Sequence, residues 1–189
     1  MNWCYTSYTI EGNQDEITDL MEKLESLSKY SKSLLPNDFG KNWLGNLVHL
    51  FGGVPEKINC RGHFLNLFYA GDNIIQFDTE TGNEELYEVW AYILQSYPSC
   101  KCYFYSEECS CQRYVTNDKE GRFYPNRFRL EYKIDDIHLM ENEHEMLIQV
   151  STIVGKEVSN WHEMEEAVRN YNKYQDEDNT VRVNKISEI

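Results

Sequence analysis

The feature of this sequence that most constrains its fold is the order of its strand and helix patterns. Residues 2–11 alternate like a strand and lead directly into a capped amphipathic helix that begins after Asn13. After a long connection come two further strand patterns, a second amphipathic helix at 83–97 and another strand. This order is typical of an antiparallel sheet with two helices on one face. The sequence therefore predicts an α+β fold.

Local signals define the first helix. Asn13 and Glu16 form a capping-box pattern, and Asp15 suits the positive end of the helix dipole. Apolar residues then recur at the spacing of one buried helix face: Ile17, Leu20, Met21, Leu24 and Leu27. We expect one core beneath the two helices, and we assign to it Trp3, Tyr5, Leu20, Leu24, Phe77, Trp90 and Leu94.

The connection at 33–57 is longer than a compact domain usually needs. It carries a short helix pattern between Trp43 and Phe51, so we interpret it as an insertion packed on the core. Strands are then expected at about 60–69 and 74–79, with a turn at Gly71 and Asp72.

The second helix is expected to begin at Thr81 or Asn83 and to end before Pro98. Further strand patterns lie at 101–105, 112–116 and 123–133. The segment 146–154 fits a helix or a β-branched strand equally well, and periodicity does not decide between them. The pair Asn160 and Glu163 caps another helix, and a last short strand is expected at 180–186.

These elements predict a ferredoxin-like βαββαβ antiparallel sandwich with an inserted helix after the first helix and extra C-terminal strands and helices. We expect a domain at 1–135, with the insertion at about 33–57. We expect 136–189 to form an α/β extension packed on that domain.

Composition sets the class of protein. Hydrophobic residues make up 41% of the chain, and the mean hydropathy is -0.66. No apolar run approaches membrane-spanning length and no secretory signal is visible, so we expect a cytoplasmic protein without a membrane partner. In that setting the six cysteines are expected to be thiols or metal ligands.

The charge is strongly acidic and unevenly placed. The formal net charge is -14, and 131–178 holds 13 acidic and 4 basic residues. Such a surface repels phosphate backbones and favours basic partners. We therefore expect an unidentified protein partner that carries basic groups, and no binding of duplex DNA. A solvated acidic face without a ligand is the alternative.

Short motifs carry a resemblance to a known family. The opening Asn2-Trp3-Cys4 resembles the start of the YubB-like ferredoxin-like domain proteins, which are small proteins encoded on plasmids, phages and other mobile elements. The run IIQFDTETG at 74–82 resembles the strand that ends Phe-Asp-Thr in those proteins and leads into their second helix. The resemblance covers about 1–135. It implies the fold and the genetic setting, because the family has no established biochemical activity.

The chain also departs from that family. Family members usually continue the Phe-Asp-Thr strand with Ala-Trp and prolines, whereas Glu80-Thr81-Gly82 follow here. The proline that usually precedes Asn-Trp-Cys is absent as well. If that turn shapes a shared binding site, the site has been lost or remodelled in this chain.

Cysteines form one candidate metal site. Residues two apart on a strand point the same way, so two facing pairs would give a tetrahedral zinc or iron site. The candidate ligands are Cys100, Cys102, Cys109 and Cys111. Their spacing differs from that of common zinc knuckles. We therefore favour reduced cysteines in a hairpin and expect no cofactor, with zinc as the alternative.

One stretch, 113–133, interleaves basic and aromatic residues, as sheets that stack nucleic-acid bases do. A single-stranded nucleic-acid site would use Arg122, Phe123, Tyr124, Arg127, Phe128 and Arg129. The net charge and the lack of an RNA-recognition motif argue against this alternative.

No catalytic signature is visible. The cluster of His138, Glu141, His144 and Glu145 does not place both histidines on one helix face. The 14 tyrosines fit either a recognition surface or the margins of a core. We therefore predict a non-catalytic accessory or regulatory protein of mobile-element type that acts through protein contacts. The alternative is a metal-binding or single-stranded nucleic-acid-binding module.

Overall fold

The computed structural model describes residues 2–133 and 136–189. The chain divides into two compact units, Met1–Asn117 and Asp118–Ile189. Each unit has its own hydrophobic core. Both units combine helices with antiparallel strands, so the predicted α+β class is confirmed.

The boundary between the units lies earlier than the predicted one after residue 135, which itself falls outside the described residues. Strand β6 (Phe128–Tyr132) explains the difference. It pairs with β7 (Ile137–Met140) and β8 (Val181–Lys185), so its hydrogen bonds tie it to the C-terminal part of the chain.

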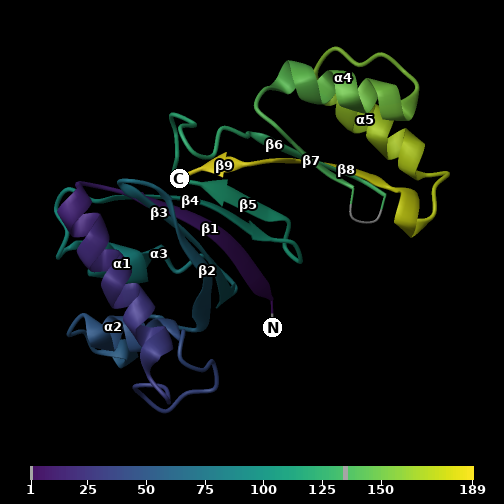
Figure 1. Ribbon diagram of the computed structural model, residues 1–189. Coiled ribbons are helices and arrows are strands. Elements are labelled where there is room, and N and C mark those ends of the chain that lie inside the picture. Colours follow the sequence, from purple (N-terminus) through teal and green to yellow (C-terminus); the bar gives the residue numbers. More distant parts are fainter. Residues whose placement is uncertain (1, 134–135) are drawn as a thin grey trace. The chain divides into compact units, whose positions relative to one another are not determined.

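The N-terminal unit is built on a sheet whose strands follow the order β2-β3-β1-β4-β5, with every neighbouring pair antiparallel. Helices α1 and α3 lie on one face of this sheet (Figure 1). The elements are β1 (Trp3–Glu11), α1 (Gln14–Lys29), α2 (Leu44–Leu50), the 3-10 turn η1 (Pro55–Lys57), β2 (Gly62–Gly71), β3 (Ile74–Gly82), α3 (Tyr87–Leu94), β4 (Lys101–Glu108) and β5 (Arg113–Thr116).

The face of β1 that packs on the core is not the face that we expected. Trp3 and Tyr5 are 37% and 47% exposed, whereas Tyr8 is fully buried. The Tyr8 ring packs 5.1 Å from Phe77 and 5.4 Å from Trp90, centroid to centroid. The assignment of Trp3 and Tyr5 to the core is therefore wrong.

The other core assignments are largely confirmed. Leu20, Leu24, Phe77 and Trp90 are buried, and Leu94 lies at the margin of the core. Burial of these side chains holds α1 and α3 on the sheet, because removing apolar surface from water is the main favourable term in folding.

Helix α1 begins as its sequence predicts. The Asn13 side chain accepts a hydrogen bond from the Glu16 amide at 2.9 Å and donates to the Glu16 carboxylate at 3.2 Å. Glu16 in turn accepts hydrogen bonds from the backbone and side chain of Ser99. The helix start is thereby joined to the segment that leads into β4.

Helix α3 is shorter than the expected helix at 83–97. Strand β3 continues to Gly82, which pairs with Trp3. Asn83 and Leu86 then adopt positive φ angles of 72° and 52°, so the chain turns twice before the helix begins. The expected cap, Thr81, donates instead to the carbonyl of Glu84 at 2.5 Å.

The C-terminal unit holds the second sheet, in the order β7-β6-β8. Its remaining elements are α4 (Glu143–Val154), α5 (Trp161–Asn172), the 3-10 turn η2 (Glu177–Asn179) and the short strand β9 (Ser187–Glu188). Segment 146–154, left open by the sequence, is helical. Asn142 caps α4 by accepting from the Glu145 amide, and Gly155 ends it at φ 68°.

Candidate functional site

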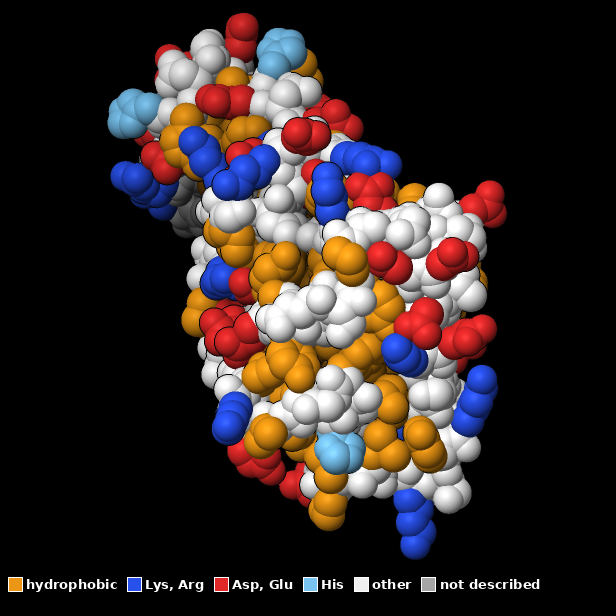
Figure 2. Space-filling model, turned by 90° about the vertical axis from the view of Figure 1, so that its left-hand side faces the viewer, with side chains coloured by type: hydrophobic (Ala, Val, Ile, Leu, Met, Phe, Trp, Pro, Cys, Tyr) orange, Lys and Arg blue, Asp and Glu red, His pale blue; other side chains and the backbone are white. Residues whose placement is uncertain are grey.

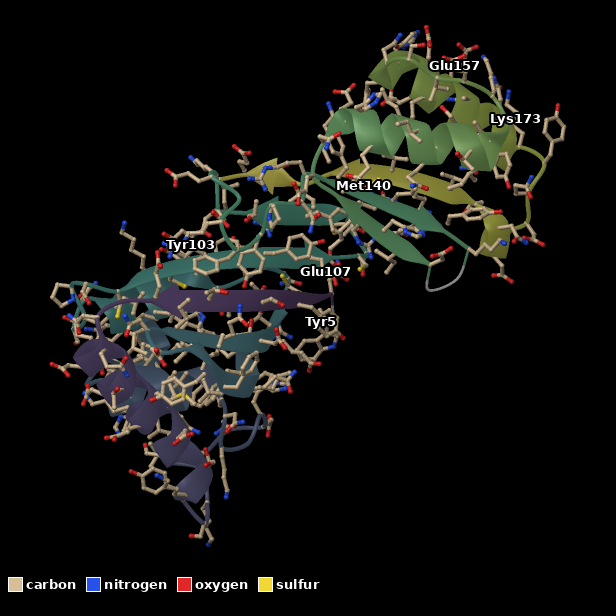
Figure 3. The ribbon with its side chains drawn as sticks, turned by 45° about the horizontal axis from the view of Figure 1, so that its top comes forward. Tyr5, Tyr103, Glu107, Met140, Glu157 and Lys173 are labelled. Atoms are coloured by element: carbon tan, nitrogen blue, oxygen red, sulfur yellow. The ribbon has the colours of Figure 1, made fainter. Side chains whose placement is uncertain are left out.

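The face of the N-terminal sheet opposite α1 and α3 carries polar and aromatic side chains. We call it the open face. At its centre, Ser7 of β1 pairs with Asp78 of β3 on one side and with Tyr105 of β4 on the other. One step along β1, Tyr5 pairs with Glu80 and Glu107, and Figure 3 shows Tyr5 near the start of β1 beside the end of β4 that carries Glu107. Paired residues share a face, so these side chains are neighbours across three strands.

A groove of about 310 Å³ lies on the open face. Ser7, a small residue at the middle of β1 between its partners Asp78 and Tyr105, is one of the residues that line the groove. The described residues that line the groove include three carboxylates and neither Lys nor Arg: Tyr5, Thr6, Ser7, Leu65, Asn66, Asp78, Thr79, Glu80, Tyr105 and Glu107.

The Asp78 carboxylate is held by two neutral donors. The Ser7 hydroxyl donates to Oδ1 at 2.8 Å, and the Asn66 amide donates to Oδ2 at 2.9 Å. Asn66 has a φ of 55° and lies where the pairing of β2 with β3 shifts register between Leu65 and Phe68. A bulge of this kind re-aims a side chain, and Asn tolerates the left-handed region better than most residues. These two donors therefore fix the position of the carboxylate, and neither of them neutralises its negative charge.

Glu80 lies two residues along β3 from Asp78. Its Oε2 is 3.3 Å from Nε2 of His63 on β2, and this contact is an ion pair only when the histidine is protonated. Two residues on one strand face are separated by about 7 Å. Asp78 and Glu80 thus present two carboxylates close enough together for a single long cationic side chain to contact both.

Tyrosine hydroxyls contact carboxylates along β4. Tyr103 donates to Glu11 at 2.9 Å, and Tyr105 lies 3.4 Å from Glu107. Both tyrosines belong to β4, which lies on the other side of β1 from β3. Tyrosine offers a rigid contact surface with a polar tip, as protein-recognition surfaces commonly do.

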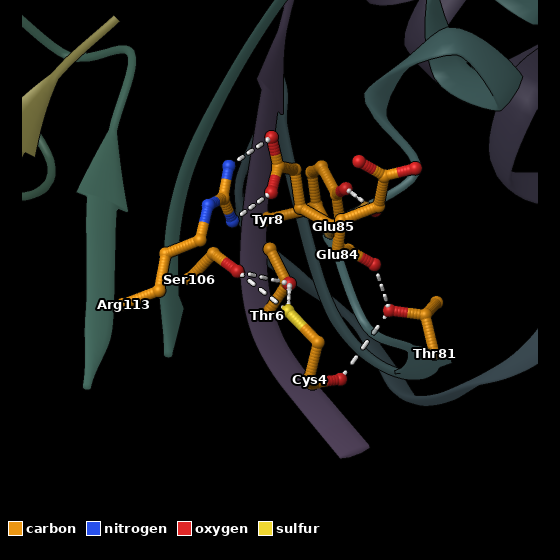
Figure 4. Close-up of polar contacts among 8 residues, drawn as sticks. All are labelled: Cys4, Thr6, Tyr8, Thr81, Glu84, Glu85, Ser106 and Arg113. Atoms are coloured by element: carbon orange, nitrogen blue, oxygen red, sulfur yellow. Dashed lines mark hydrogen bonds and ion pairs between the residues drawn. The ribbon is translucent and has the colours of Figure 1, made fainter. Parts of the chain in front are cut away.

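The opposite face of the sheet carries a partly buried polar cluster (Figure 4). Arg113 makes two hydrogen bonds to the Glu85 carboxylate, at 2.5 and 3.2 Å, and these raise the pKa of the guanidinium. Tyr8 donates to the Glu85 carbonyl at 2.5 Å. The ion pair and the tyrosine together hold the segment that precedes α3, so this cluster has a structural role.

Cys4 belongs to the same cluster and is itself buried. Its sulfur lies 3.0 Å from the Ser106 hydroxyl and 3.8 Å from that of Thr6. Burial raises the pKa of the Cys4 thiol, so the group is protonated at neutral pH. A nucleophilic cysteine requires the thiolate, and this environment disfavours it.

The four cysteines of the candidate metal site lie near the two ends of β4. Cys102 is at its start, buried, and burial raises its pKa. Cys109 and Cys111 lie in the exposed turn beyond its other end. The two pairs are separated by roughly 20 Å of extended strand. The four sulfurs that the metal alternative requires therefore do not face one another.

Several residues of the nucleic-acid alternative make contacts that stabilise the C-terminal unit. Phe128 packs in the C-terminal core, and Arg129 is 3% exposed and pairs with Glu131. Arg127 donates to the carbonyls of Tyr124 and Asp118. Acidic and basic side chains are interspersed over this unit on the face shown in Figure 2. Arg122 lies over the Phe123 ring, 4.9 Å from its centroid, whereas Phe128 and Arg129 are buried, so the six residues do not share one exposed stacking surface.

Other candidates lack the geometry of a metal centre. Within 2–133 and 136–189, no group of three or more His, Cys, Asp or Glu side chains is placed to hold a metal ion. His138 lies on β7, whereas His144 lies on α4. None of the helices in the same ranges is long and apolar enough to cross a bilayer.

Sequence reasoning did not identify the groove. One signal was available, because alternation along β3 turns Asp78 and Glu80 to one face and the buried Phe77 and Thr79 to the other. The contribution of Asn66 could not be found in this way, because it depends on the bulge in β2.

Comparisons with known proteins identified no relative of this chain. No model of a protein family matches the chain, and no curated protein or solved structure matches it.

Proposed function

We propose that this chain is a non-catalytic accessory or regulatory protein that binds a basic segment of a protein partner through its open face. The observation that carries this proposal is the groove over Ser7, where Asp78 and Glu80 lie beside the exposed ring of Tyr5. Carboxylates steer and orient basic segments, and tyrosine supplies contact area at little cost in conformational entropy.

Charge favours a protein partner over a nucleic acid. The groove is lined by Asp78, Glu80 and Glu107, and the chain carries a formal net charge of -14. Phosphates are repelled by such a surface. The burial of Phe128 and the separation of the cysteine pairs give no support to the nucleic-acid and metal alternatives.

We also propose a ferredoxin-like arrangement for the N-terminal unit. The order β2-β3-β1-β4 and the two helices on one face support it. The proposed kinship with YubB-like mobile-element proteins rests on the short motifs. In the Phe77-Asp78-Thr79 motif the outer residues are buried and Asp78 lines the groove, which supports a packing role for the motif and the binding role that we propose for Asp78.

Peptide binding tests the proposed function. Short fluorescent peptides of alternating Gly-Lys, Gly-Arg and Gly-Glu would be titrated with the intact protein at low and at physiological salt. We expect both basic peptides to bind, more weakly as salt increases, and the acidic peptide not to bind. The double variant Asp78→Asn/Glu80→Gln should weaken binding about tenfold or more, because two attractive charges are removed.

A matched variant controls for net charge. Asp72→Asn/Glu84→Gln removes the same number of charges from exposed positions outside the groove, and we expect it to bind like the unmodified chain. Equal weakening by both double variants would mean that only net charge attracts the peptides. That result, or no binding of either basic peptide, would refute the proposed function.

A further inference from the structure

The groove has room for one long side chain. Its volume of about 310 Å³ lies at the lower end of the range for small-molecule pockets. Tyr5, 47% exposed, is one of the residues that line the groove, and Asp78 lies diagonally across the β1–β3 pair from it. Diagonal neighbours on a sheet are separated by about 7 to 8 Å. A flat cationic group fits between an aromatic face and a carboxylate at that separation.

The chemistry of Asp78 favours a ligand that donates several hydrogen bonds. Each of its oxygens accepts one bond, from Ser7 or from Asn66. A carboxylate offers about four acceptor sites, so both oxygens retain capacity. The two donors also fix the carboxylate in place, which lowers the entropy lost when a ligand binds.

Arginine satisfies these features better than lysine. Its guanidinium is planar, stacks on aromatic rings and donates two parallel hydrogen bonds to a carboxylate. The lysine ammonium is a compact, strongly hydrated charge that does not stack in this way. Glu80, one step further along β3, extends the acidic wall and lies opposite Tyr5.

We propose that the groove binds an arginine side chain of the partner, with the guanidinium hydrogen-bonded to Asp78 and stacked on Tyr5. The inference rests on the proposed function, since it names the group that the open face recognises. It makes Asp78 the residue that determines specificity and Asn66 a positioning residue that acts through Asp78.

Blocked amino acids test the inference directly. The intact protein, labelled with nitrogen-15, would be titrated with the N-acetyl methylamides of arginine, lysine and citrulline, the last being a neutral analogue of arginine. We expect amide shifts centred on Tyr5, Ser7 and Asp78, with arginine binding about tenfold more tightly than lysine and citrulline causing no saturable shift.

Variants then separate recognition from folding. Asp78→Asn should abolish the preference for arginine, whereas Asp72→Asn, in the exposed turn after β2, should keep it. Tyr5→Phe should retain binding and Tyr5→Ala should weaken it, because stacking needs the ring and not the hydroxyl. Unchanged amide dispersion establishes that each variant is folded.

The outcomes distinguish the inference from the proposed function. Equal affinity for blocked arginine and lysine, or an Asp78→Asn variant that keeps the preference, overturns the arginine assignment. If the Gly-Lys and Gly-Arg peptides nevertheless bind to the open face, the proposed function stands. If neither peptide binds, both fall.

Discussion

Asp118 organises the loop at the start of the C-terminal unit. Its Oδ2 accepts hydrogen bonds from the amides of Phe123 and Tyr124, at 2.6 and 2.8 Å. Arg127 closes the same loop by donating to the Asp118 carbonyl at 2.9 Å. Burial by itself would raise the pKa of the Asp118 carboxyl, but these amide donors and the nearby guanidinium outweigh it and lower the pKa below the usual 3.8.

This lowered pKa predicts a pH dependence of stability. A carboxyl group whose pKa is lower in the folded chain stabilises it above the unfolded value, and that stability is lost as the pH falls through the folded value. Asp118→Asn should therefore reduce the free energy of unfolding by about 1 to 3 kcal/mol at neutral pH. The difference from the unmodified chain should shrink below about pH 4.

Urea unfolding at neutral and acid pH measures both effects. Asp178→Asn, at an exposed position of the same unit, is the control and should change little at either pH. A constant difference between Asp118→Asn and the unmodified chain down to pH 2 would show that the carboxylate charge does not hold the loop.

Among the elements, helices α1 and α3 each pack a leucine on the core, and the two leucines are buried to different degrees. Leu24 of α1 is 1% exposed, whereas Leu94 is the last residue of α3 and only partly buried. Both are leucines on the same core, so the cost of truncating each depends on how much surface and packing is lost.

We expect Leu24→Ala to lower the free energy of unfolding by about 2 to 5 kcal/mol and Leu94→Ala to lower it by less. Urea midpoints at constant slope measure the difference. Ile148→Ala, at a 51% exposed position of α4, should leave the midpoint nearly unchanged. An unchanged midpoint for Leu24→Ala would contradict the buried face assigned to α1.

At the scale of the whole molecule, charge is the dominant property. The formal net charge is -14, and 131–178 contributes 13 acidic and 4 basic residues. Two of the basic residues just before that segment form ion pairs: Arg127 lies 2.9 Å from Glu188, and Arg129 pairs with Glu131. The chain therefore presents an excess of negative charge to a polyanion.

We accordingly expect no binding of duplex DNA at physiological salt, where charges interact over a Debye length of about 8 Å. Fluorescence anisotropy of a labelled duplex measures this, with a labelled single strand of the same sequence in parallel. At most weak, strongly salt-dependent binding is expected for the single strand. Tight binding of either that persists at physiological salt would contradict the assignment of a protein partner.

Local sequence alone determined where most helices begin. Asn13 with Glu16 and Asn160 with Glu163 predict caps that the structure forms, because a cap depends on side chains within three residues of one another. The same signal, Asn142 with Glu145, was available for α4, whose segment the sequence left open. The positive φ angles of Asn83 and Leu86, which delay α3, follow no comparable local pattern.

Only the tertiary structure decided which face of β1 is buried and what the open face presents. Both faces of β1 carry aromatic residues, so alternation could not choose between Tyr5 and Tyr8; the packing of Phe77 and Trp90 on Tyr8 did. Likewise, Ser7, Asn66 and Asp78 meet because three strands pair in one register and one of them bulges. Register joins residues far apart in the sequence, so it depends on the complete sheet, whereas capping and helix periodicity depend on neighbours along the chain.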